Sequence, residues 1–463
     1  MSFDVRGKKI LIMGLGLHGG GVGTARFFAK QGALLTITDL RTQDQLKTSI
    51  AALKKYKGIT YVLGRHRKND FLRADIIIKN PSVPPTSPYL VFARNNGIPI
   101  TTDVSIFLRQ CPATIIGVTG TRGKSTTCFL IFKFLETFFN AHRKKNSPRV
   151  FLGGNIRTSV LDFMDMTTSR DVVVLELSSF QLDDLAHDSW DNTSAKRRSP
   201  HVAVLTNILR DHLNWHTNMQ SYIAAKAMIF KYQKQSDILF ANGSDKTVKK
   251  IIARAPSRVK CPQLAKKLTP IVDANLGSHY RSSVALAIGV GTHFNIPQAM
   301  MTSILHAFKG LPSRQELTAQ IKGISFINDT TATIPDASIA AIKRFRLLAK
   351  KSHLILIAGG SDKQLKFFEM AHLISLSVDH LILLPGTATN QLLYELTKKK
   401  ISHVFSLQKT ESMQEAVRIA MALAKKGDYV LLSPGAASFG LFANEFDRGN
   451  QFVVAVKSLN EKI

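Results

Sequence analysis

A segment near residue 120 combines the residue types that bind the phosphate groups of a nucleotide. Residues Ile115–Thr126 form an apolar run and a glycine loop that ends in Gly-Lys-Ser-Thr. In such a loop, backbone N–H groups surround phosphate oxygens, a lysine neutralises the β- and γ-phosphates, and a hydroxyl binds Mg²⁺. The loop departs from the strict P-loop pattern only because Val118 stands at the first glycine position. The ATP-binding residues predicted from this segment are Gly120, Thr121, Arg122, Gly123, Lys124, Ser125 and Thr126.

Two polar residues follow the strands expected beside this loop. Glu176 lies at the end of the apolar run 171–177, and His212 follows the run 201–207. Ligands of parallel α/β sheets collect at the carboxyl ends of the strands, so Glu176 suits a magnesium site there. A carboxylate can also cap a turn, and a single histidine is often purely structural. The residues alone therefore leave both alternatives open.

A second glycine motif lies near the N-terminus. Gly14–Gly19 matches G-x-G-x-x-G after an apolar run, and Asp39 ends the next run. This pattern is typical of a dinucleotide fold, in which the acid binds a ribose hydroxyl. The physical requirement is only a diphosphate at a helix N-terminus, which a UDP-sugar satisfies as well as NAD does. Glycines needed only for a tight turn are the remaining alternative.

Strands and helices alternate along almost the whole chain, as in a parallel sheet covered by helices. A length of 463 residues suggests about three domains. Pro112 precedes a new strand, and 310–312 marks a second boundary. We expect an α/β fold with three domains in series. They are a Rossmann-like domain over 1–111, a central P-loop domain with a mostly parallel sheet over 112–310, and a Rossmann-like domain over 311–463.

The formal net charge of +30 permits nucleic acid, an anionic surface or phosphorylated substrates as partners. The basic clusters are short, and no aromatic residues alternate with them, so we expect no nucleic-acid groove. No apolar run approaches the roughly 18–20 residues that span a bilayer. Three widely separated cysteines fit a reducing compartment. We therefore expect a cytoplasmic protein without membrane insertion or a signal peptide.

Taken together, these motifs resemble the Mur ligase family, which consists of ATP-dependent amide ligases of peptidoglycan precursor synthesis. The resemblance covers nearly the whole chain, and its motifs occur in the order found in the family. They are the loop 119–126, the segments 176–182 and 207–216, the helix with Lys226, and the segments 311–314, 328–333, 359–363 and 433–439. The first and last motifs look most like those of the members that add D-glutamate.

The resemblance implies a reaction in three steps. The carboxylate of UDP-N-acetylmuramoyl-L-alanine attacks the γ-phosphate of ATP, and an acyl phosphate forms. The amine of D-glutamate then attacks the acyl carbon, and phosphate leaves a tetrahedral intermediate. The resemblance also implies two Mg²⁺ ions and ATP as co-substrate, and we expect a monomer. A Mur-type ligase for another amino acid and an NAD(P)-dependent oxidoreductase are the alternatives.

Roles for single residues follow from the resemblance. The catalytic positions are Lys124, Glu176, His212 and Lys226. Ser125 and Glu176 match ligands of a first Mg²⁺, while His212 matches a ligand of a second. Lys226 matches a lysine that CO₂ carbamylates near that metal, although sequence alone would favour an exposed helix lysine. The substrate positions are Leu17, His18, Asp39, Arg41, Asn80, Ser82 and Asn155 for the UDP-sugar, His279, Arg314 and Asp329 for ATP, and Thr333, Lys363, Ser438 and Phe446 for D-glutamate.

The chain also departs from the family pattern at several positions. These are Arg122 in place of asparagine, Leu209 in place of a small hydroxyl residue, Tyr280 and Ser283 in place of asparagines, Ser313 in place of histidine, and Thr331 in place of lysine. The phosphate and metal positions are intact, so we expect an active enzyme with altered contacts. An oxidoreductase would leave the phosphate loop unexplained, and a nucleic-acid ATPase would leave the C-terminal third without a role.

Overall fold

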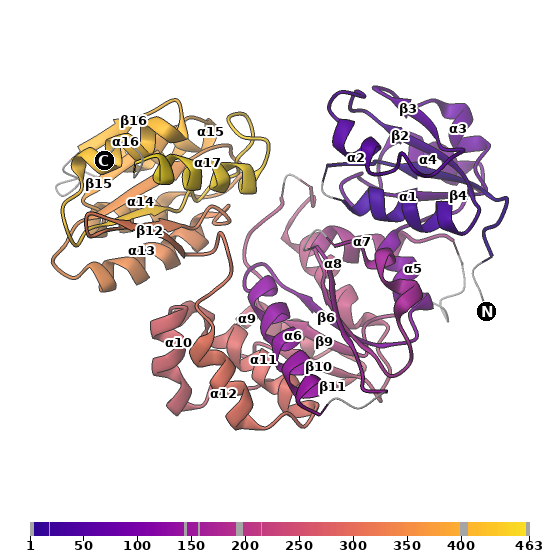
Figure 1. Ribbon diagram of the computed structural model, residues 1–463, viewed down its shortest axis with the longest axis horizontal. Coiled ribbons are helices and arrows are strands. Elements are labelled where there is room, and N and C mark those ends of the chain that lie inside the picture. Colours follow the sequence, from indigo (N-terminus) through magenta and orange to yellow (C-terminus); the bar gives the residue numbers. More distant parts are fainter. Residues whose placement is uncertain are drawn as a thin grey trace. The chain divides into compact units, whose positions relative to one another are not determined.

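The computed structural model describes residues 4–17, 19–142, 146–155, 158–190, 198–213, 215–398 and 406–459. They contain three separate sheets with helices packed on them (Figure 1), which confirms the expected three-domain α/β fold. By compactness the chain divides into two units. The first comprises 1–208, 218–264 and 282–304, and the second comprises 209–217, 265–281 and 305–463.

The first sheet, drawn in indigo in Figure 1, has five parallel strands in the order β3-β2-β1-β4-β5. The chain leaves β1 toward β2 on one side and returns to add β4 on the other, which creates a crevice at the carboxyl ends of β1 and β4. The elements are β1 Lys9–Met13, α1 Gly20–Lys30, β2 Leu34–Asp39, α2 Lys47–Ala51, β3 Thr60–Leu63, α3 Lys68–Leu72, β4 Ile76–Lys79, α4 Pro88–Asn95, β5 Ile100–Thr101 and α5 Asp103–Gln110.

The core explains why these strands are apolar without interruption. Ile10 and Ile12 pack into a cluster with Phe28 of α1, whereas Leu11 belongs to a cluster with Leu90 of α4. Both faces of β1 are therefore covered, and every position along the strand favours an apolar side chain. The first cluster also includes Ile115 of the second sheet. The two N-terminal sheets thus share one core within the first unit.

The second sheet is parallel throughout, in the order β11-β10-β9-β6-β8-β7. Here β6 is the point from which the chain adds strands on both sides, so its carboxyl end is again a predicted ligand crevice. The elements are β6 Thr114–Thr119, α6 Lys124–Ala141, β7 Val150–Gly154, β8 Val172–Glu176, α7 Ser179–His187, β9 Val202–Leu205, α8 Met219–Lys231, β10 Ile238–Ala241, α9 Lys246–Ile252, β11 Arg258–Lys260, α10 Thr269–Asn275, α11 Arg281–His293 and α12 Gln298–Ala307.

The third sheet has the order β12-β13-β17-β14-β15-β16, with β12 antiparallel to β13 and the other pairs parallel. One face packs on α13–α15 through residues such as Ile342, and the other packs on α16 and α17 through residues such as Phe452. The elements are β12 Glu316–Ile321, β13 Ile324–Asn328, α13 Pro335–Ala349, β14 Leu354–Gly359, α14 Phe368–Ser377, β15 His380–Leu384, α15 Thr387–Lys398, β16 Ser406–Lys409, α16 Met413–Leu423, β17 Tyr429–Leu432 and α17 Glu445–Ser458.

Short 3₁₀ helices complete the described structure. They are η1 Val160–Asp162, η2 Met164–Met166, η4 Lys266–Leu268 and η5 Ser278–Tyr280. Among the residues that the structure describes, no helix combines the length and the apolar character needed to cross a membrane.

Candidate functional site

The predicted phosphate loop joins the end of β6 to the start of α6. Gly120 has a φ angle of 147° and Gly123 one of 82°, and residues other than glycine rarely adopt these backbone conformations. A Cβ atom on Gly120 would lie 1.9 Å from the hydroxyl oxygen of Thr206, so the loop has no room for one. Gly123 caps an 18-residue helix. The helix N-terminus presents backbone N–H groups and positive dipole charge to the loop, which favours bound phosphate.

Residues after β9 hold the loop through the backbone of Arg122. Its carbonyl oxygen accepts hydrogen bonds from Thr206 Oγ1 at 2.6 Å and from Asn207 Nδ2 at 3.1 Å. Its N–H donates to Asn207 Oδ1 at 2.8 Å. These contacts involve no side-chain atom of Arg122. The departure from the usual asparagine at this position is therefore compatible with an intact loop conformation.

Lys124 and Ser125 begin helix α6, and Ser125 contacts the end of β8. Lys124 Nζ donates to the carbonyl oxygen of Thr121 at 3.0 Å, which folds the lysine across the loop. Ser125 Oγ donates to Glu176 Oε2 at 2.5 Å, and Asn155 Nδ2 donates to Glu176 Oε1 at 3.0 Å. The structure therefore brings Ser125, Glu176 and Asn155 together. Hydroxyl and carboxylate oxygens are the ligands that Mg²⁺ prefers, so Ser125 and Glu176 fit a magnesium site.

Lys226 lies on α8 with only 2% of its surface exposed, so the alternative of an exposed helix lysine is wrong. Its Nζ atom donates to the carbonyl oxygen of Gly120 at 2.9 Å, which places it against the phosphate loop. Tyr222, one helical turn earlier, lies beneath this ammonium group, with the ring centroid 4.8 Å from Nζ. The Tyr222 hydroxyl is 2.9 Å from Thr121 Oγ1. The sequence analysis missed Tyr222, although its spacing of four residues from Lys226 puts both on one helix face.

A cavity of about 460 Å³ lies at the carboxyl ends of β1, β2 and β4 in the first sheet, and Asp39, Arg41, Asn80 and Ser82 all line it. Asp39 is 3% exposed. Its carboxylate accepts from Gly16 N at 3.1 Å and from Arg41 N at 2.9 Å. The acid therefore braces the glycine loop from inside the cavity. Its predicted contact with a ribose remains a prediction.

Asn80 shapes the other wall of this cavity. Its Oδ1 atom accepts from both N and Oγ of Ser82, at 3.0 and 2.8 Å, and its Nδ2 atom donates to Gly14 O at 3.3 Å. A Cβ atom on Gly14 would lie 2.8 Å from Asn80 Cβ, so this glycine permits the close approach. Leu17 is 49% exposed and does not line the cavity, and His18 lies outside the described residues.

His66 and Tyr89 also line the cavity, and the sequence analysis missed both. Their ring centroids are 5.0 Å apart in an edge-to-face arrangement. His66 Nδ1 lies 2.7 Å from Thr38 Oγ1. Burial lowers the pKa of His66, while the nearby Asp39 acts in the opposite direction. The cavity thus has an aromatic side. Neither residue belongs to a recognisable motif, so no local signal could have identified them.

In the third sheet, the residues predicted to bind D-glutamate lie on loops after three adjacent strands. Thr333 follows β13, Lys363 follows β14 and Ser438 follows β17. Backbone hydrogen bonds connect these loops. Gly435 N donates to Ala332 O at 2.8 Å, and Ser361 and Ala437 exchange bonds of 2.9 and 3.0 Å. The structure therefore joins the three loops into one surface. Phe446 lies in the first turn of the nearby helix α17.

The residues predicted to bind ATP in this unit lie close to one another. Asp329 is buried and accepts from Gln315 N at 3.2 Å and from Ser433 Oγ at 2.9 Å. Arg314 NH1 donates to Thr331 Oγ1 at 3.2 Å, and this hydroxyl donates to Ser313 O at 3.1 Å. Two of the departures from the family pattern, at Ser313 and Thr331, are therefore in direct contact.

His279 and His212 occupy different surroundings within the second unit. Burial lowers the pKa of His279 to about 4, and the positive charge of Arg344 adds to this effect. His212 has a φ angle of 55°, and its Nε2 atom lies 3.5 Å from Asp211 Oδ2. Lys363 Nζ lies 3.8 Å from the other oxygen of Asp211. Asp211 therefore connects a predicted metal ligand with a predicted glutamate-binding lysine.

Arg448 lies on α17, beyond the motif 433–439, and was missed by the sequence analysis. It is completely buried. Its guanidinium donates to Thr330 Oγ1 at 3.1 Å, Thr330 O at 2.8 Å and Ala436 O at 3.1 Å. Burial lowers its pKa to about 10, which leaves it charged at neutral pH. Arg448 therefore links the loop after β13 to the loop after β17.

The predicted metal ligands are divided between the two units. Ser125, Glu176 and Lys226 belong to the first, whereas His212 belongs to the second. Within the described part of the chain, no three His, Cys, Asp or Glu side chains are grouped as metal ligands. The participation of His212 and a carbamylated Lys226 in a second metal site therefore stays a prediction.

Comparisons with known proteins cover nearly the whole chain. Residues 8–102 match the MurD-like N-terminal domain of Mur ligases, residues 118–288 match the Mur ligase middle domain, and residues 313–435 match the Mur ligase glutamate ligase domain. A relative from Roseiflexus sp. (strain RS-1), UDP-N-acetylmuramoylalanine--D-glutamate ligase, is 38% identical over 98% of this chain and 99% of its own. A relative of the same name from Borreliella afzelii is 37% identical with the same coverage.

Solved structures show the same fold at low sequence identity. MurF ligase from Thermotoga maritima in complex with ADP has a TM-score of 0.58 at 15% identity, covering 99% of this chain and 97% of that one. FolC of E. coli in complex with DHPP and ADP has a TM-score of 0.52 at 17% identity, covering 78% of this chain and 92% of that one.

Proposed function

This chain belongs to the Mur ligase family, and we propose that it joins D-glutamate to UDP-N-acetylmuramoyl-L-alanine with the consumption of ATP. The observation that carries the proposal is the match over 98% of the chain to relatives named for that ligase activity. The intact phosphate loop, with Ser125 paired to Glu176, supports the use of ATP. We further propose that the enzyme acts as a monomer in the cytoplasm.

The reaction requires two transfers at one carboxyl group. In the first, a carboxylate oxygen of the UDP-linked substrate attacks the γ-phosphorus of ATP, ADP leaves and an acyl phosphate remains. In the second, the amine of D-glutamate attacks the acyl carbon, and the tetrahedral intermediate expels phosphate as the amide bond forms and the amine loses its proton. Both steps develop negative charge on oxygen, so preorganised positive groups lower the barriers.

Lys124 and the start of α6 supply such positive groups. With ATP bound, Nζ of Lys124 would exchange the Thr121 carbonyl for phosphate oxygens, which carry more negative charge. Backbone N–H groups from Gly123 onward would bind the same phosphates at the helix N-terminus. The braced backbone of Arg122 keeps these donors in place before the substrate arrives.

Ser125 and Glu176 would hold one Mg²⁺, which when bound adds positive charge at the phosphate oxygens. Asn155 orients the Glu176 carboxylate through its amide. The proposal also includes a second Mg²⁺ with His212 and a carbamylated Lys226. After Nζ of Lys226 loses a proton, its addition to CO₂ with release of a second proton would replace a buried ammonium group by an anionic carbamate next to the phosphate loop.

The remaining substrate sites follow from the residues already placed. We assign the UDP group to the cavity lined by Asp39, Arg41, Asn80 and Ser82. The carboxylates of D-glutamate need a cation and hydroxyl donors, which Lys363, Thr333 and Ser438 provide on connected loops.

Release of phosphate by the full chain tests the proposal. With ATP, Mg²⁺ and UDP-N-acetylmuramoyl-L-alanine, a panel of amino acids should give phosphate only with D-glutamate. Lys124→Ala should abolish this release, whereas Lys133→Ala, a change at a half-buried position farther along the same helix, should not. Preference for another amino acid would point to a different Mur-type ligase. Reduction of a nicotinamide without ATP, or ATP hydrolysis stimulated by DNA or RNA, would contradict the proposal.

A further inference from the structure

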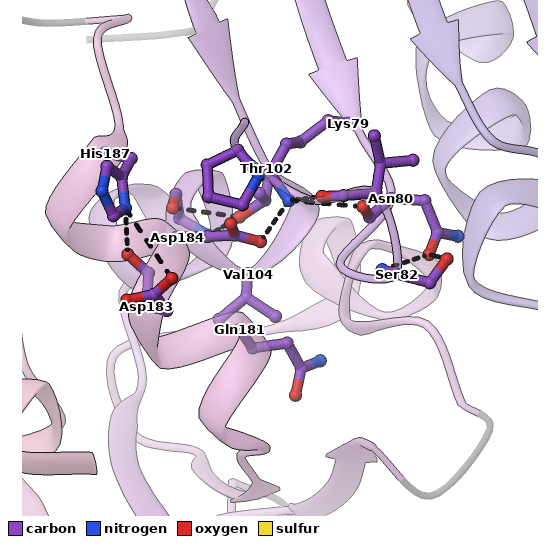
Figure 2. Close-up of polar contacts among 12 residues, drawn as sticks. Lys79, Asn80, Ser82, Thr102, Val104, Gln181, Asp183, Asp184 and His187 are labelled. Atoms are coloured by element: carbon purple, nitrogen blue, oxygen red, sulfur yellow. Dashed lines mark hydrogen bonds and ion pairs between the residues drawn. The ribbon is translucent and has the colours of Figure 1, made fainter. Parts of the chain in front are cut away.

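A buried ion pair lies next to the turn 80–83, which forms part of the wall of the cavity in the first sheet. Lys79 is the last residue of β4, and Asp184 lies on α7. Their Nζ and Oδ2 atoms are 2.7 Å apart, and the two side chains are 3% and 2% exposed. Lysine is almost never buried to this degree unless it is paired. Figure 2 shows its side chain pointing toward Asp184 and toward the turn that carries Asn80 and Ser82.

The same ammonium group also binds the backbone of that turn. Lys79 Nζ donates to the carbonyl oxygens of Asn80 at 3.3 Å and of Val83 at 2.9 Å. Together with Asp184, these acceptors match the three N–H donors of a lysine. Lys79 thus holds both ends of the turn 80–83, and Asn80, Ser82 and Val83 of this turn line the cavity.

The other partner of the pair belongs to a helix fixed near the phosphate loop. Helix α7 starts with a capping box formed by Ser178 and Gln181, shortly after Glu176. Leu177 N donates to Val118 O at 2.9 Å, which continues the sheet between these positions. Asp184 therefore projects from a helix whose start is set by the strand end that carries Glu176. Lys79 therefore connects the turn 80–83 in the wall of the cavity to helix α7.

We propose that Lys79 is a positioning residue for the UDP-linked substrate, which holds the turn 80–83 in its binding conformation and against helix α7. An apolar pair of similar volume could join β4 to α7 equally well, because buried ion pairs often stabilise no more than such replacements do. An apolar pair could not donate to the two carbonyl groups. The inference rests on the proposed assignment of the cavity to the UDP group.

The charges around the pair show why Lys79 cannot be replaced on its own. Burial raises the pKa of Asp184 to about 7, Lys79 opposes this rise, and Asp183 and Asp103 add to it. Removal of Lys79 alone would leave Asp184 buried without its cation, and the protein could then fail to fold. Replacement of both by apolar residues removes this difficulty.

The experiment compares two variants of the full chain with a matched control. Lys79→Met/Asp184→Leu removes the pair and the two donations to the turn. Asp184→Asn keeps an acceptor for Lys79 and leaves both donations possible. Lys133→Met/Glu136→Leu makes the same chemical change at a partly exposed ion pair on α6. The measurements are the melting temperature, the Kd for the UDP-linked substrate by calorimetry, and KM for each substrate.

We expect the melting temperature of the first double variant to stay close to that of the wild type. Its Kd and KM for the UDP-linked substrate should rise about tenfold or more, while KM for ATP and kcat should change less than about twofold. This is the pattern expected when only binding of that substrate is lost. Asp184→Asn and the control should stay within about threefold of the wild type in all constants. An unchanged Kd in the first double variant, or equal losses for ATP and the UDP-linked substrate, would overturn the inference.

Arg41→Ala and Asn80→Ala separate this inference from the assignment of the cavity. If both raise the Kd for the UDP-linked substrate while Lys79→Met/Asp184→Leu does not, only the role of Lys79 is wrong. If neither raises it, the cavity is not the UDP site, and the assignment and the inference fall together.

Discussion

Arg122 shows that a departure from the family pattern in the phosphate loop can leave the conformation of the loop intact. The contacts that fix this residue use its N–H and carbonyl groups, which every residue except proline has. Asn207 provides two of these contacts through one side-chain amide. The geometry of the loop therefore depends more on Asn207 than on the side chain at position 122.

Asn207→Ala should lower kcat/KM for ATP by about 10- to 100-fold, because about 1–3 kcal/mol is lost when buried backbone groups lose their partner. Arg122→Asn, which installs the residue usual in the family, should have a smaller effect. Steady-state kinetics at varied ATP concentration measure both. A larger loss in Arg122→Asn than in Asn207→Ala would contradict this reading of the loop.

His279 gives the folded protein a dependence on pH whose sign can be worked out. Its pKa falls from the ordinary value of 6.5 to about 4, first because of burial and then because of Arg344. Between these values the unfolded chain binds a proton that the folded chain does not, so the free energy of unfolding falls as the pH is lowered from 6.5 to 4. Above pH 6.5 His279 is neutral in both the folded and the unfolded chain, so this loss of stability is absent there.

The prediction is tested by urea unfolding of the wild type and His279→Gln at several pH values. The wild type should lose more stability than the variant between pH 6.5 and pH 4. Parallel curves for the two proteins over this interval would show that His279 does not titrate in the expected way.

At the scale of helices and strands, the sequence predicted the interior of each sheet better than its edges. The runs that became β1, β6, β8 and β14 are apolar except at some of their end residues, because both faces of those strands are covered. The edge strands β3, β7, β11, β12 and β16 and the interior strand β10 were not predicted, whereas the edge strand β5 was. All three residues of β11 are exposed, and β12 leaves Leu317 60% exposed. Neither β11 nor β12 carries a continuous apolar run that could identify it.

The residues of the candidate site also divide into those that a local pattern identifies and those that it does not. Lys124, Ser125 and Glu176 could be predicted because each lies in a motif next to a strand end. Tyr222, Arg448, His66 and Lys79 act through contacts between segments that are distant in sequence, and among them only the spacing of Tyr222 from Lys226 is a local signal. The burial of Lys79 in particular depends on a carboxylate 105 residues away.

Arg448 offers a test of how helix α17 supports the C-terminal loops. Arg448→Met should lower the free energy of unfolding by about 3 kcal/mol or more, because buried carbonyl oxygens on both loops lose a charged donor. Denaturant unfolding measures the change. Arg418→Met, at an exposed position on the neighbouring helix α16, is the matched control and should change little. Equal stabilities for the two variants would show that Arg448 does not stabilise the loops after β13 and β17.

At the scale of the whole molecule, the predicted ATP-binding residues belong to two compact units. The phosphate loop lies in the first, and Arg314 and Asp329 lie in the second. An acyl phosphate must also be protected from water, which favours closure of the C-terminal domain on the central one when ATP binds. Small-angle scattering should show a smaller radius of gyration with a non-hydrolysable ATP analogue. Identical profiles with and without the analogue would contradict closure.

The net charge of +30 has only a partial explanation at this scale. UDP-linked substrate, ATP and glutamate are all anionic, so a positive field around their sites raises the rate of encounter. This accounts for an excess of cations around those sites.

The most direct test of the central claim follows an oxygen atom from the substrate carboxylate into phosphate. UDP-N-acetylmuramoyl-L-alanine labelled with ¹⁸O in its carboxyl group is incubated with the enzyme, ATP, Mg²⁺ and D-glutamate, and the released phosphate is analysed by mass spectrometry. Attack of the carboxylate on the γ-phosphate predicts that each phosphate carries one labelled oxygen atom for each amide bond formed. Amide product accompanied by unlabelled phosphate would contradict the account.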